Sequence, residues 1–351
     1  MSFMVKNKEI DPYEVIRGRY ESNVKNFILS DLFNSDFNPD NELVEDIKNN
    51  KIVIYTAFTG DYDSLKEPDF IDDNCDYVCF SDNPNLSSDT WKIIPMEEST
   101  LDNNRKAKQY KVLPHKYFPD YKYSFWLDGT FKIKGSIREY IYKYINSLML
   151  CVVHPERDCI FDEAESSIQF ERYSNFTINK QVKGYADMGM PKHYGLPVLG
   201  AIFREHNNSE IIELMNEWWD EIIHFTNQDQ LSLTYLMWKH EFHPSVAPIY
   251  YWINEYWTKE GKYHHKEEVK DYISSRNLIK SLKENIKDKN KLSKEEILLL
   301  FNDIDALKDE AHFLNVMRNN IDNELISLRN SSSWKITKPL RKLANLKKSD
   351  K

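Results

Sequence analysis

Apolar, β-rich runs alternate with helix-like segments along the middle of this chain, and this alternation limits the folds that it can adopt. The clearest helical segments are 102–115, 136–145 and 209–225, and Ser136 is a predicted N-cap. The strand-like runs are 51–60, 75–82, 91–96, 121–129, 148–155 and 197–205. Strands that are joined by helices pair mostly in parallel. We therefore predict an α/β fold with a mostly parallel sheet flanked by helices over roughly 50–260.

Composition and charge narrow the function. The 351 residues are 41% hydrophobic and 13% aromatic, enough to build the core of one large or two modest domains. With 9 glycines, the chain has neither the Gly-rich phosphate loop of P-loop proteins nor that of dinucleotide-binding proteins. The net charge of −9 is uneven, because 331–351 hold seven basic residues and one acid while 1–330 carry −15. A body this acidic excludes a general nucleic-acid binder.

The sequence shows neither an export signal nor a membrane-spanning run. The segment MSFMVKNKEIDPYEV lacks the apolar core of a signal peptide, and no run of about 18 apolar residues occurs. The four cysteines form no C-x-x-C pair, and we interpret them as reduced, buried thiols. We therefore expect a cytoplasmic protein.

The segment YSFWLDGTFKIKG contains an apolar run that ends abruptly at Asp128, which Gly129 follows. A hairpin turn would explain an Asp-Gly pair in this place. A ligand site would explain it equally well, because α/β sheets bind ligands at the carboxyl ends of their strands. The carboxylate could then hold a divalent cation, and the glycine would let the backbone approach the ligand closely.

Four segments carry a resemblance to a known family, and two shorter ones also fit it. The four are YTAFTGDYDSLKEP (55–68), CFSDN (79–83), NRKAKQYKVLPHKYFPDYKYSFWLDG (104–129) and NQDQLSLTY (227–235); the two are HPERDCIFDEA (154–164) and GAIFREH (200–206). By the shared order and spacing of these segments, the chain resembles GT-A-type glycosyltransferases. Within them it is similar to the glycosyltransferase-like family formerly catalogued as a domain of unknown function, which has plant mucilage-related and bacterial polysaccharide-related members.

The resemblance implies a GT-A-like sheet and an enzyme of surface polysaccharide synthesis. Such an enzyme moves a sugar from a nucleotide-diphosphate donor, expected to be of UDP type, to a glycan or lipid-linked acceptor. A nucleotidyltransferase is an alternative that shares the sheet, but that class usually has a Gly-rich, basic loop where this chain has 55–68. A non-catalytic scaffold, a decayed transferase domain on a coiled coil, is a second alternative.

The resemblance also assigns contacts with the nucleoside. Thr56, Ala57 and Phe58 end the first strand, where such enzymes lay the base along the backbone. Asp82 ends the second strand and would take the base or the ribose hydroxyls. A plain strand end and a turn aspartate are the respective alternatives.

Basic residues would contact the phosphates of the donor. Arg105 and Lys108 lie one turn apart on a predicted helix and could reach the phosphates as charged donors. A solvated basic face is the alternative explanation. Arg157 and Arg204 follow later strands, and they would line the same edge of the sheet if those strands run parallel to the others.

A cation, Mn²⁺ or Mg²⁺, would neutralise the diphosphate at Asp128. GT-A enzymes place an Asp-x-Asp motif here, but position 130 of this chain is Thr, and one carboxylate binds a metal weakly. This departure is the best support for the scaffold alternative. His154 is the first candidate for a second ligand, ahead of His240 and His243. A packed histidine, or a reaction without a metal, is the alternative.

Asp229 lies at the start of a predicted helix, between Gln228 and Gln230. As a carboxylate that faces the acceptor hydroxyl, it would be the general base of an inverting transferase. In a retaining transferase it would only orient the sugar, and with Gln228 it would bind sugar hydroxyls. Helix capping is the alternative.

We divide the chain into a helical segment, 1–50, a catalytic domain, 51–264, a coiled-coil region, 265–330, and a basic amphipathic tail, 331–351. A capping box at 293–296 opens a heptad pattern. The apolar a and d positions are Leu300, Ile304, Leu307, Ala311, Leu314, Ile321, Leu325 and Leu328. A helix docked on the main domain is the alternative to a coiled coil.

The heptads predict a homo-oligomer, most simply a parallel dimer, because an apolar seam that keeps its register for about four heptads needs a partner helix. Sedimentation velocity should give a dimer for the full-length protein and a monomer for a protein that ends at residue 264. A monomeric full-length protein would indicate the docked helix instead.

The tail, 331–351, predicts contact with the cytoplasmic membrane face. It combines Trp334, Leu343 and Leu346 with basic side chains, as interfacial helices do. A disordered basic tail is the alternative. The full-length protein should co-sediment with anionic liposomes at low salt, and a protein that ends at residue 330 should not. Equal recovery of the two proteins would contradict the prediction.

Overall fold

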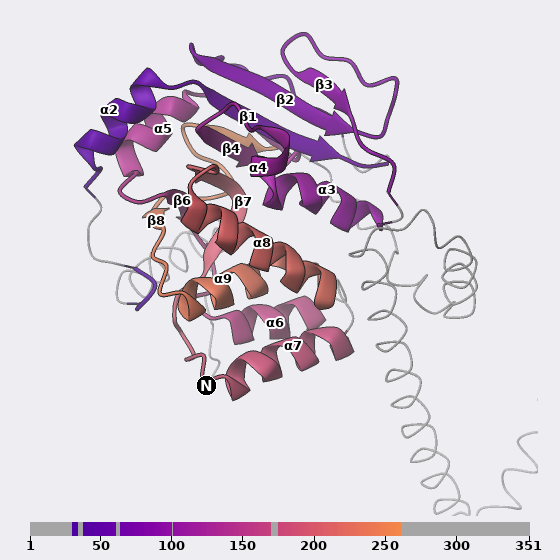
Figure 1. Ribbon diagram of the computed structural model, residues 1–351, viewed down its shortest axis with the longest axis vertical. Helices are drawn as coiled ribbons and strands as arrows, with labels where there is room; N and C mark the ends of the chain where they lie inside the picture. The colour runs from indigo at the N-terminus through magenta and orange to yellow at the C-terminus, as the bar shows by residue number, and fades with distance from the viewer. Residues whose placement is uncertain (1–29, 34–37, 61–63, 100, 170–174, 261–351) are drawn as a thin grey trace, which may run out of the picture. The chain divides into compact units, whose positions relative to one another are not determined.

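The structure is a computed structural model that describes residues 30–33, 38–60, 64–99, 101–169 and 175–260 (Figure 1). The predicted coiled-coil region and the basic tail lie outside the described residues, so both stay predictions. Among the helices of the described ranges, none combines the length and the apolar character needed to cross a bilayer.

Seven strands form the central sheet, in the order β3-β2-β1-β4-β7-β6-β8. Their bounds are β1 Ile52–Phe58, β2 Cys75–Ser81, β3 Lys92–Pro95, β4 Tyr123–Leu127, β6 Met149–Val153, β7 Pro197–Arg204 and β8 Ser245–Ala247. All neighbours pair in parallel except β7, which runs antiparallel to both β4 and β6. A separate antiparallel pair joins β5, Phe131–Ile133, to β9, Trp257–Lys259. The predicted α/β fold with a mostly parallel sheet is confirmed.

Several of the described helices begin after a residue whose side chain caps them. The bounds of the helices are α2 Asn41–Asn49, α3 Asn103–Val112, α4 Pro114–Tyr117, α5 Ile137–Tyr144, α6 Ile160–Gln169, α7 Asn175–Asp187, α8 Ser209–His224 and α9 Asp229–Lys239. The side chain of Ser136 accepts the backbone N–H of Glu139, which confirms the predicted cap of α5. Asp102 caps α3 in the same way, through the N–H of Arg105. Pro114 begins α4, because a first helical position needs no N–H donor.

The sheet separates two apolar cores, because successive side chains of a strand point to opposite faces. In β1, Val53 and Tyr55 belong to the core that α3, α6, α7, α8 and α9 cover. Ile52 and Ile54 belong to the core that α2, α5 and the β5–β9 pair cover. Burial on both faces explains why these strands are apolar throughout. Since α2 and β1 share a core, the predicted boundary after residue 50 falls between two elements of one packed body.

The carboxyl ends of β1, β2, β4 and β6 meet at one edge of the sheet, because these four strands run in the same direction (Figure 1). The antiparallel β7 begins at this edge, where the N–H of Asp128 donates to the carbonyl of Gly200 at 2.8 Å. The chain therefore gathers the residues after four strands, and those at the start of a fifth, at one place. We call this place the carboxyl edge.

Candidate functional site

Asp128 lies in a turn at the carboxyl edge, and this turn does not form a hairpin, because β5 pairs with β9 and not with β4. The N–H of Phe131 donates to the carbonyl of Asp128 at 3.0 Å, which closes the turn between β4 and β5. The Asp128 side chain is 39% exposed and directly follows the buried β4. The turn therefore leaves a carboxylate accessible at the edge where α/β sheets bind ligands.

Two glycines permit close contacts beside Asp128. A Cβ on Gly129 would lie 2.2 Å from the ring of Phe58, so the ring packs directly on the turn backbone. A Cβ on Gly200 would lie 1.7 Å from the Tyr251 hydroxyl and 2.7 Å from Oδ2 of Asp128. The Tyr251 hydroxyl and the Asp128 carboxylate thus both lie over Gly200 of β7. Phe58 is buried and belongs to the core beside this turn.

Two lysines and two aspartates form a compact group, which we call the lysine–aspartate cluster. Lys108 and Lys111 of α3 both contact Oδ2 of Asp229, with Nζ–O distances of 2.7 Å and 2.6 Å. The Nζ of Lys111 is also 3.8 Å from Oδ1 of Asp128. The side chains of Lys111 and Asp229 are 5% and 7% exposed, so this is a buried ion pair that reaches the surface through Asp128.

Trp126 of β4 contacts both Asp128 and Lys111 of the cluster. Its Nε1–H donates to Oδ1 of Asp128 at 2.7 Å, and the Nζ of Lys111 lies 5.8 Å from the centre of its ring. A tryptophan beside an ammonium is a favourable cation–π arrangement. Lys111 was not among the predicted site residues, although its spacing of three from Lys108 puts both on neighbouring turns of one helix face.

The electrostatics of the cluster hold Asp229 ionised. Burial raises the pKa of Asp229, but the attraction of Lys108 and Lys111 lowers it by a larger amount. The pKa of Asp229 therefore lies below its usual value. Burial and the neighbouring Lys111 lower the pKa of Lys108, against the attraction of Asp229. A carboxylate whose pKa is lowered by two ammonium groups is a weak general base at neutral pH. Asp229 therefore holds two ammonium groups in the structure, and its role as a general base stays a prediction.

The predicted nucleoside contacts lie at the ends of β1 and β2. Thr56 is buried, and Ala57 is partly exposed. Asp82 follows β2 and accepts the N–H of Gly60 at 2.9 Å, so it ties the loop after β1 to the end of β2. Lys106 of α3 comes within 3.9 Å of the same carboxylate. Helix α3 therefore contacts the end of β2 through Lys106 and also supplies both lysines of the lysine–aspartate cluster.

Two predicted phosphate-binding arginines are engaged by backbone carbonyls. Arg105 is buried and donates to the carbonyls of Ile222 and Phe225, so it attaches α3 to the end of α8. Arg204 is fully buried and donates to the carbonyl of Lys111 at 2.8 Å. The expectation that Arg204 lies at the carboxyl edge is wrong, because β7 is antiparallel and Arg204 pairs with Ser124 near the start of β4.

The remaining predicted residues form a second polar network around Glu163 of α6. Arg157 and Gln228 both donate to its carboxylate, at 2.5 Å and 2.8 Å. His154 follows β6, and its Nδ1 accepts the N–H groups of Glu156 and Arg157. Burial and the nearby Arg157 lower the pKa of His154 well below its usual value, so the imidazole is neutral. Gln228 is next to Asp229 and links this network to the lysine–aspartate cluster.

The described side chains around Asp128 do not form a site that fits a divalent cation. One Asp128 oxygen already accepts the Trp126 N–H and lies near the Lys111 ammonium. Asp229 is engaged by two lysines, and both nitrogens of His154 face groups of the other network. Hard cations bind where several oxygen ligands converge without competing ammonium groups. We therefore derive no chemistry through a cation at this place.

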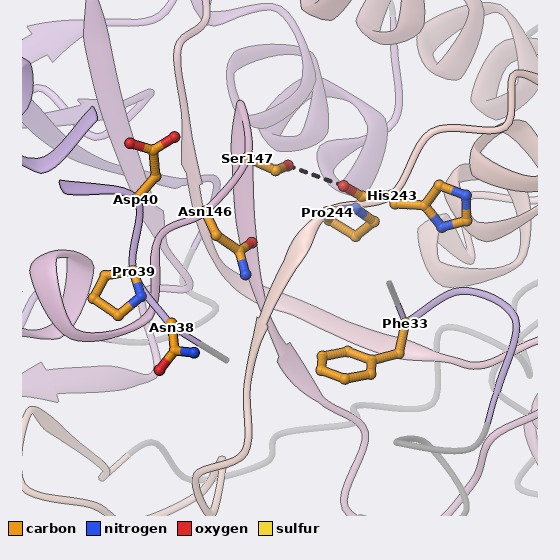
Figure 2. A pocket seen from close by; sticks show the side chains of 8 residues that line it. All are labelled: Phe33, Asn38, Pro39, Asp40, Asn146, Ser147, His243 and Pro244. Carbon is orange, nitrogen blue, oxygen red and sulfur yellow. Dashed lines mark hydrogen bonds between the residues drawn. The ribbon is translucent and has the colours of Figure 1, made fainter. Parts of the chain in front are cut away.

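A surface pocket lies away from these residues (Figure 2). It is lined by Phe33, Asn38, Pro39, Asp40, Asn146, Ser147, His243 and Pro244. Within it, the hydroxyl of Ser147 donates to the carbonyl of His243 at 2.9 Å. These residues precede α2, β6 and β8, so the pocket is at the opposite edge of the sheet from Asp128. His243 is therefore not positioned to share a ligand with Asp128.

Comparison with known proteins gives a family. A family model described as TOD1/MUCI70, glycosyltransferase-like domain, matches residues 26–255. A protein of Arabidopsis thaliana named probable hexosyltransferase MUCI70 is 26% identical over 157 residues. That match covers 41% of this chain and 27% of the relative, so the chain spans about a quarter of the relative's length.

The buried ion pair predicts a large loss of stability on Asp229→Asn. The change would leave Lys108 and Lys111 without their shared counter-charge, and breaking a buried pair typically costs about 3–5 kcal/mol of unfolding free energy. Asp220→Asn, at an exposed position of α8, is the matched control and should change stability by less than about 0.5 kcal/mol. Urea denaturation of both variants measures the difference. Equal midpoints would contradict the assignment.

The same pair predicts acid sensitivity. Because the pKa of Asp229 is lower in the folded than in the unfolded protein, its stabilisation is present above the ordinary value of about 3.9. It is lost as the pH falls from that value through the lowered folded pKa. The stability gap between wild type and Asp229→Asn should therefore narrow below about pH 4. A gap that does not change with pH would exclude ionised Asp229 as its cause.

Proposed function

This chain belongs to the TOD1/MUCI70 glycosyltransferase-like family, and from that membership we propose that it is a glycosyltransferase of GT-A type. We propose that it moves a sugar from a nucleotide-diphosphate donor of UDP type to a glycan or lipid-linked acceptor. The observation that carries the proposal is the lysine–aspartate cluster at the carboxyl edge, within the residues that match the family.

The phosphates of the donor bind, in this proposal, along α3. Lys106 and Lys108 are each 15% exposed, and their ammonium groups lie beside Asp82 and Asp229, respectively. An ammonium group binds a phosphate as a compact point charge and does not need a fixed orientation. The proposed diphosphate site therefore extends from the end of β2 to the lysine–aspartate cluster.

The proposed reaction breaks one bond to the sugar and forms another. The bond between the sugar carbon and the diphosphate oxygen breaks, while the acceptor oxygen bonds to that carbon and loses its proton. Negative charge grows on the departing diphosphate, and a fixed ammonium such as that of Lys108 stabilises it. The lysines thereby supply positive charge at the place where the sequence analysis expected Mn²⁺ or Mg²⁺.

The two aspartates take different roles in the proposal. Asp128 is the more exposed and lies at the surface end of the cluster, so we assign it to the transferred sugar or the acceptor hydroxyl. Asp229 holds Lys108 and Lys111 in place, and its catalytic role becomes one of positioning. Trp126 orients Asp128 through its N–H, and Gly129 keeps the backbone of the turn close to Phe58.

A non-catalytic scaffold is the second candidate, and one observation favours it. The usual second aspartate is replaced by Thr130, and the described side chains near Asp128 do not fit a cation. The oligomer, the membrane contact of the tail and the lipid-linked acceptor remain proposals in either case.

Incubation with a panel of nucleotide sugars should show transfer or slow hydrolysis of one donor. Lys108→Met should lower turnover about 100-fold, the usual effect of removing one stabilising group from an anionic transition state. Lys116→Met, at an exposed position of α4, is the matched control and should stay within about twofold. Asp128→Asn should abolish transfer while the melting temperature stays near that of wild type. Each reaction is run with EDTA and with Mn²⁺, and equal rates would support charge supplied by lysine.

The outcomes separate the two candidates. A protein that binds nucleotides but neither transfers nor hydrolyses any donor would be the scaffold. Full activity of both Lys108→Met and Asp128→Asn would place the reaction elsewhere in the molecule.

A further inference from the structure

Three residues with metal-binding side chains meet at a place that the proposed reaction does not use. They are Cys159, just before α6, Asp162, in its first turn, and His193, in the segment before β7. One ligand atom from each lies within 4.8 Å of the other two. Cys159 is one of the free cysteines and is 1% exposed, whereas Asp162 and His193 are exposed. A buried thiol thus lies near two exposed side chains that can change their rotamers.

The types of side chain at this place indicate which metal it would bind. A thiolate, an imidazole and a carboxylate together suit Zn²⁺, which binds four ligands as a tetrahedron. Metal–ligand bonds of about 2.0–2.3 Å put the ligand atoms of such a site roughly 3.5 Å apart. The observed upper limit of 4.8 Å is close enough for small rotations of the exposed Asp162 and His193 to close the site. Three protein ligands leave the fourth position to water.

Asp158 supplies an independent observation that points to a ligand at His193. Its carboxylate contacts Nδ1 of His193 at 2.8 Å. Carboxylates orient metal-binding histidines in this way, because the contact fixes the ring and leaves the other nitrogen available. His193 also has a φ of 57°, in the left-handed region that a β-carbon disfavours.

We propose that Cys159, Asp162 and His193 bind one Zn²⁺ ion, with Asp158 orienting the histidine. The metal joins the start of α6 to the segment that leads into β7, two places already linked by the N–H of Gly195 and the carbonyl of Asp158 at 2.9 Å. Glu163 follows Asp162 directly, and its carboxylate accepts Gln228, the neighbour of Asp229. By joining these two segments, the zinc stabilises the wall beside the lysine–aspartate cluster, and its fourth position stays open to water. This proposal does not depend on the proposed transferase activity.

Cobalt substitution tests the site in the full-length protein. After removal of metal with a chelator, Co²⁺ should bind at one equivalent and give both the visible bands of four-coordinate cobalt and a thiolate charge-transfer band. One equivalent of Zn²⁺ should remove both signals. The charge-transfer band is the specific readout, since His264 and His265 also bind Co²⁺ in principle but provide no thiolate.

Four variants separate this site from adventitious binding. Cys159→Ser should abolish the charge-transfer band, and Cys75→Ser, which changes a different free cysteine, should leave it unchanged. His193→Asn should lower the affinity at least 100-fold while it keeps a residue that tolerates the left-handed backbone. Asp158→Asn should lower the affinity about 10–100-fold, as expected for a residue that orients a ligand.

Zinc should also stabilise the fold, because it binds the folded protein in preference to the unfolded one. Saturating Zn²⁺ should raise the melting temperature of the metal-free wild type by at least about 5 °C and that of Cys159→Ser by less than about 1 °C. The proposal is overturned if no thiolate band appears, if the band persists in Cys159→Ser, or if His193→Asn binds with wild-type affinity.

Discussion

The carboxylate of Asp229, buried between Lys108 and Lys111, is the contact on which the rest of the site depends. A buried charge is stable only when it is paired and hydrogen-bonded. This requirement fixes the start of α9 against α3, and the indole N–H of Trp218 in α8 donates to the Asp229 carbonyl at 3.1 Å. Three helices therefore converge on one residue, and one of the two lysines that it holds, Lys111, also approaches the accessible Asp128.

Sheet topology determines which residues can join this group. The parallel strands deliver Asp82 and Asp128 to the carboxyl edge, and the antiparallel β7 brings Gly200 beside them. Because β7 is antiparallel, Arg204 lies beside the first residues of β4, and it donates a hydrogen bond to the carbonyl of Lys111 in α3. The direction of β7 therefore keeps Arg204 away from the carboxyl edge.

Local patterns in the sequence were sufficient to predict six strands of the central sheet, but not the three-residue strands β5, β8 and β9. Alternating apolar runs predicted the strands, and Ser136 was identified as a cap because its role depends on residues within one turn. The places of Asp128 after a strand and of Lys108 on a helix could be predicted because both are local features, and the roles of the two residues stay proposals. The partner of Lys111 is not, since the bond to Asp229 spans 118 positions. The packed role of Arg105 and the network around Glu163 were missed for the same reason, as tertiary contacts decide them.

The central claim is that the lysines held by Asp229 bind the diphosphate of a nucleotide. Titration calorimetry with nucleosides, nucleoside monophosphates and nucleoside diphosphates tests it most directly, because only the number of phosphates changes along each series. For the base that binds, affinity should rise with each phosphate, and Lys108→Met should reduce the affinity of the diphosphate much more than that of the nucleoside. Equal affinity for a nucleoside and its diphosphate, or an equal loss for both in Lys108→Met, would contradict the account.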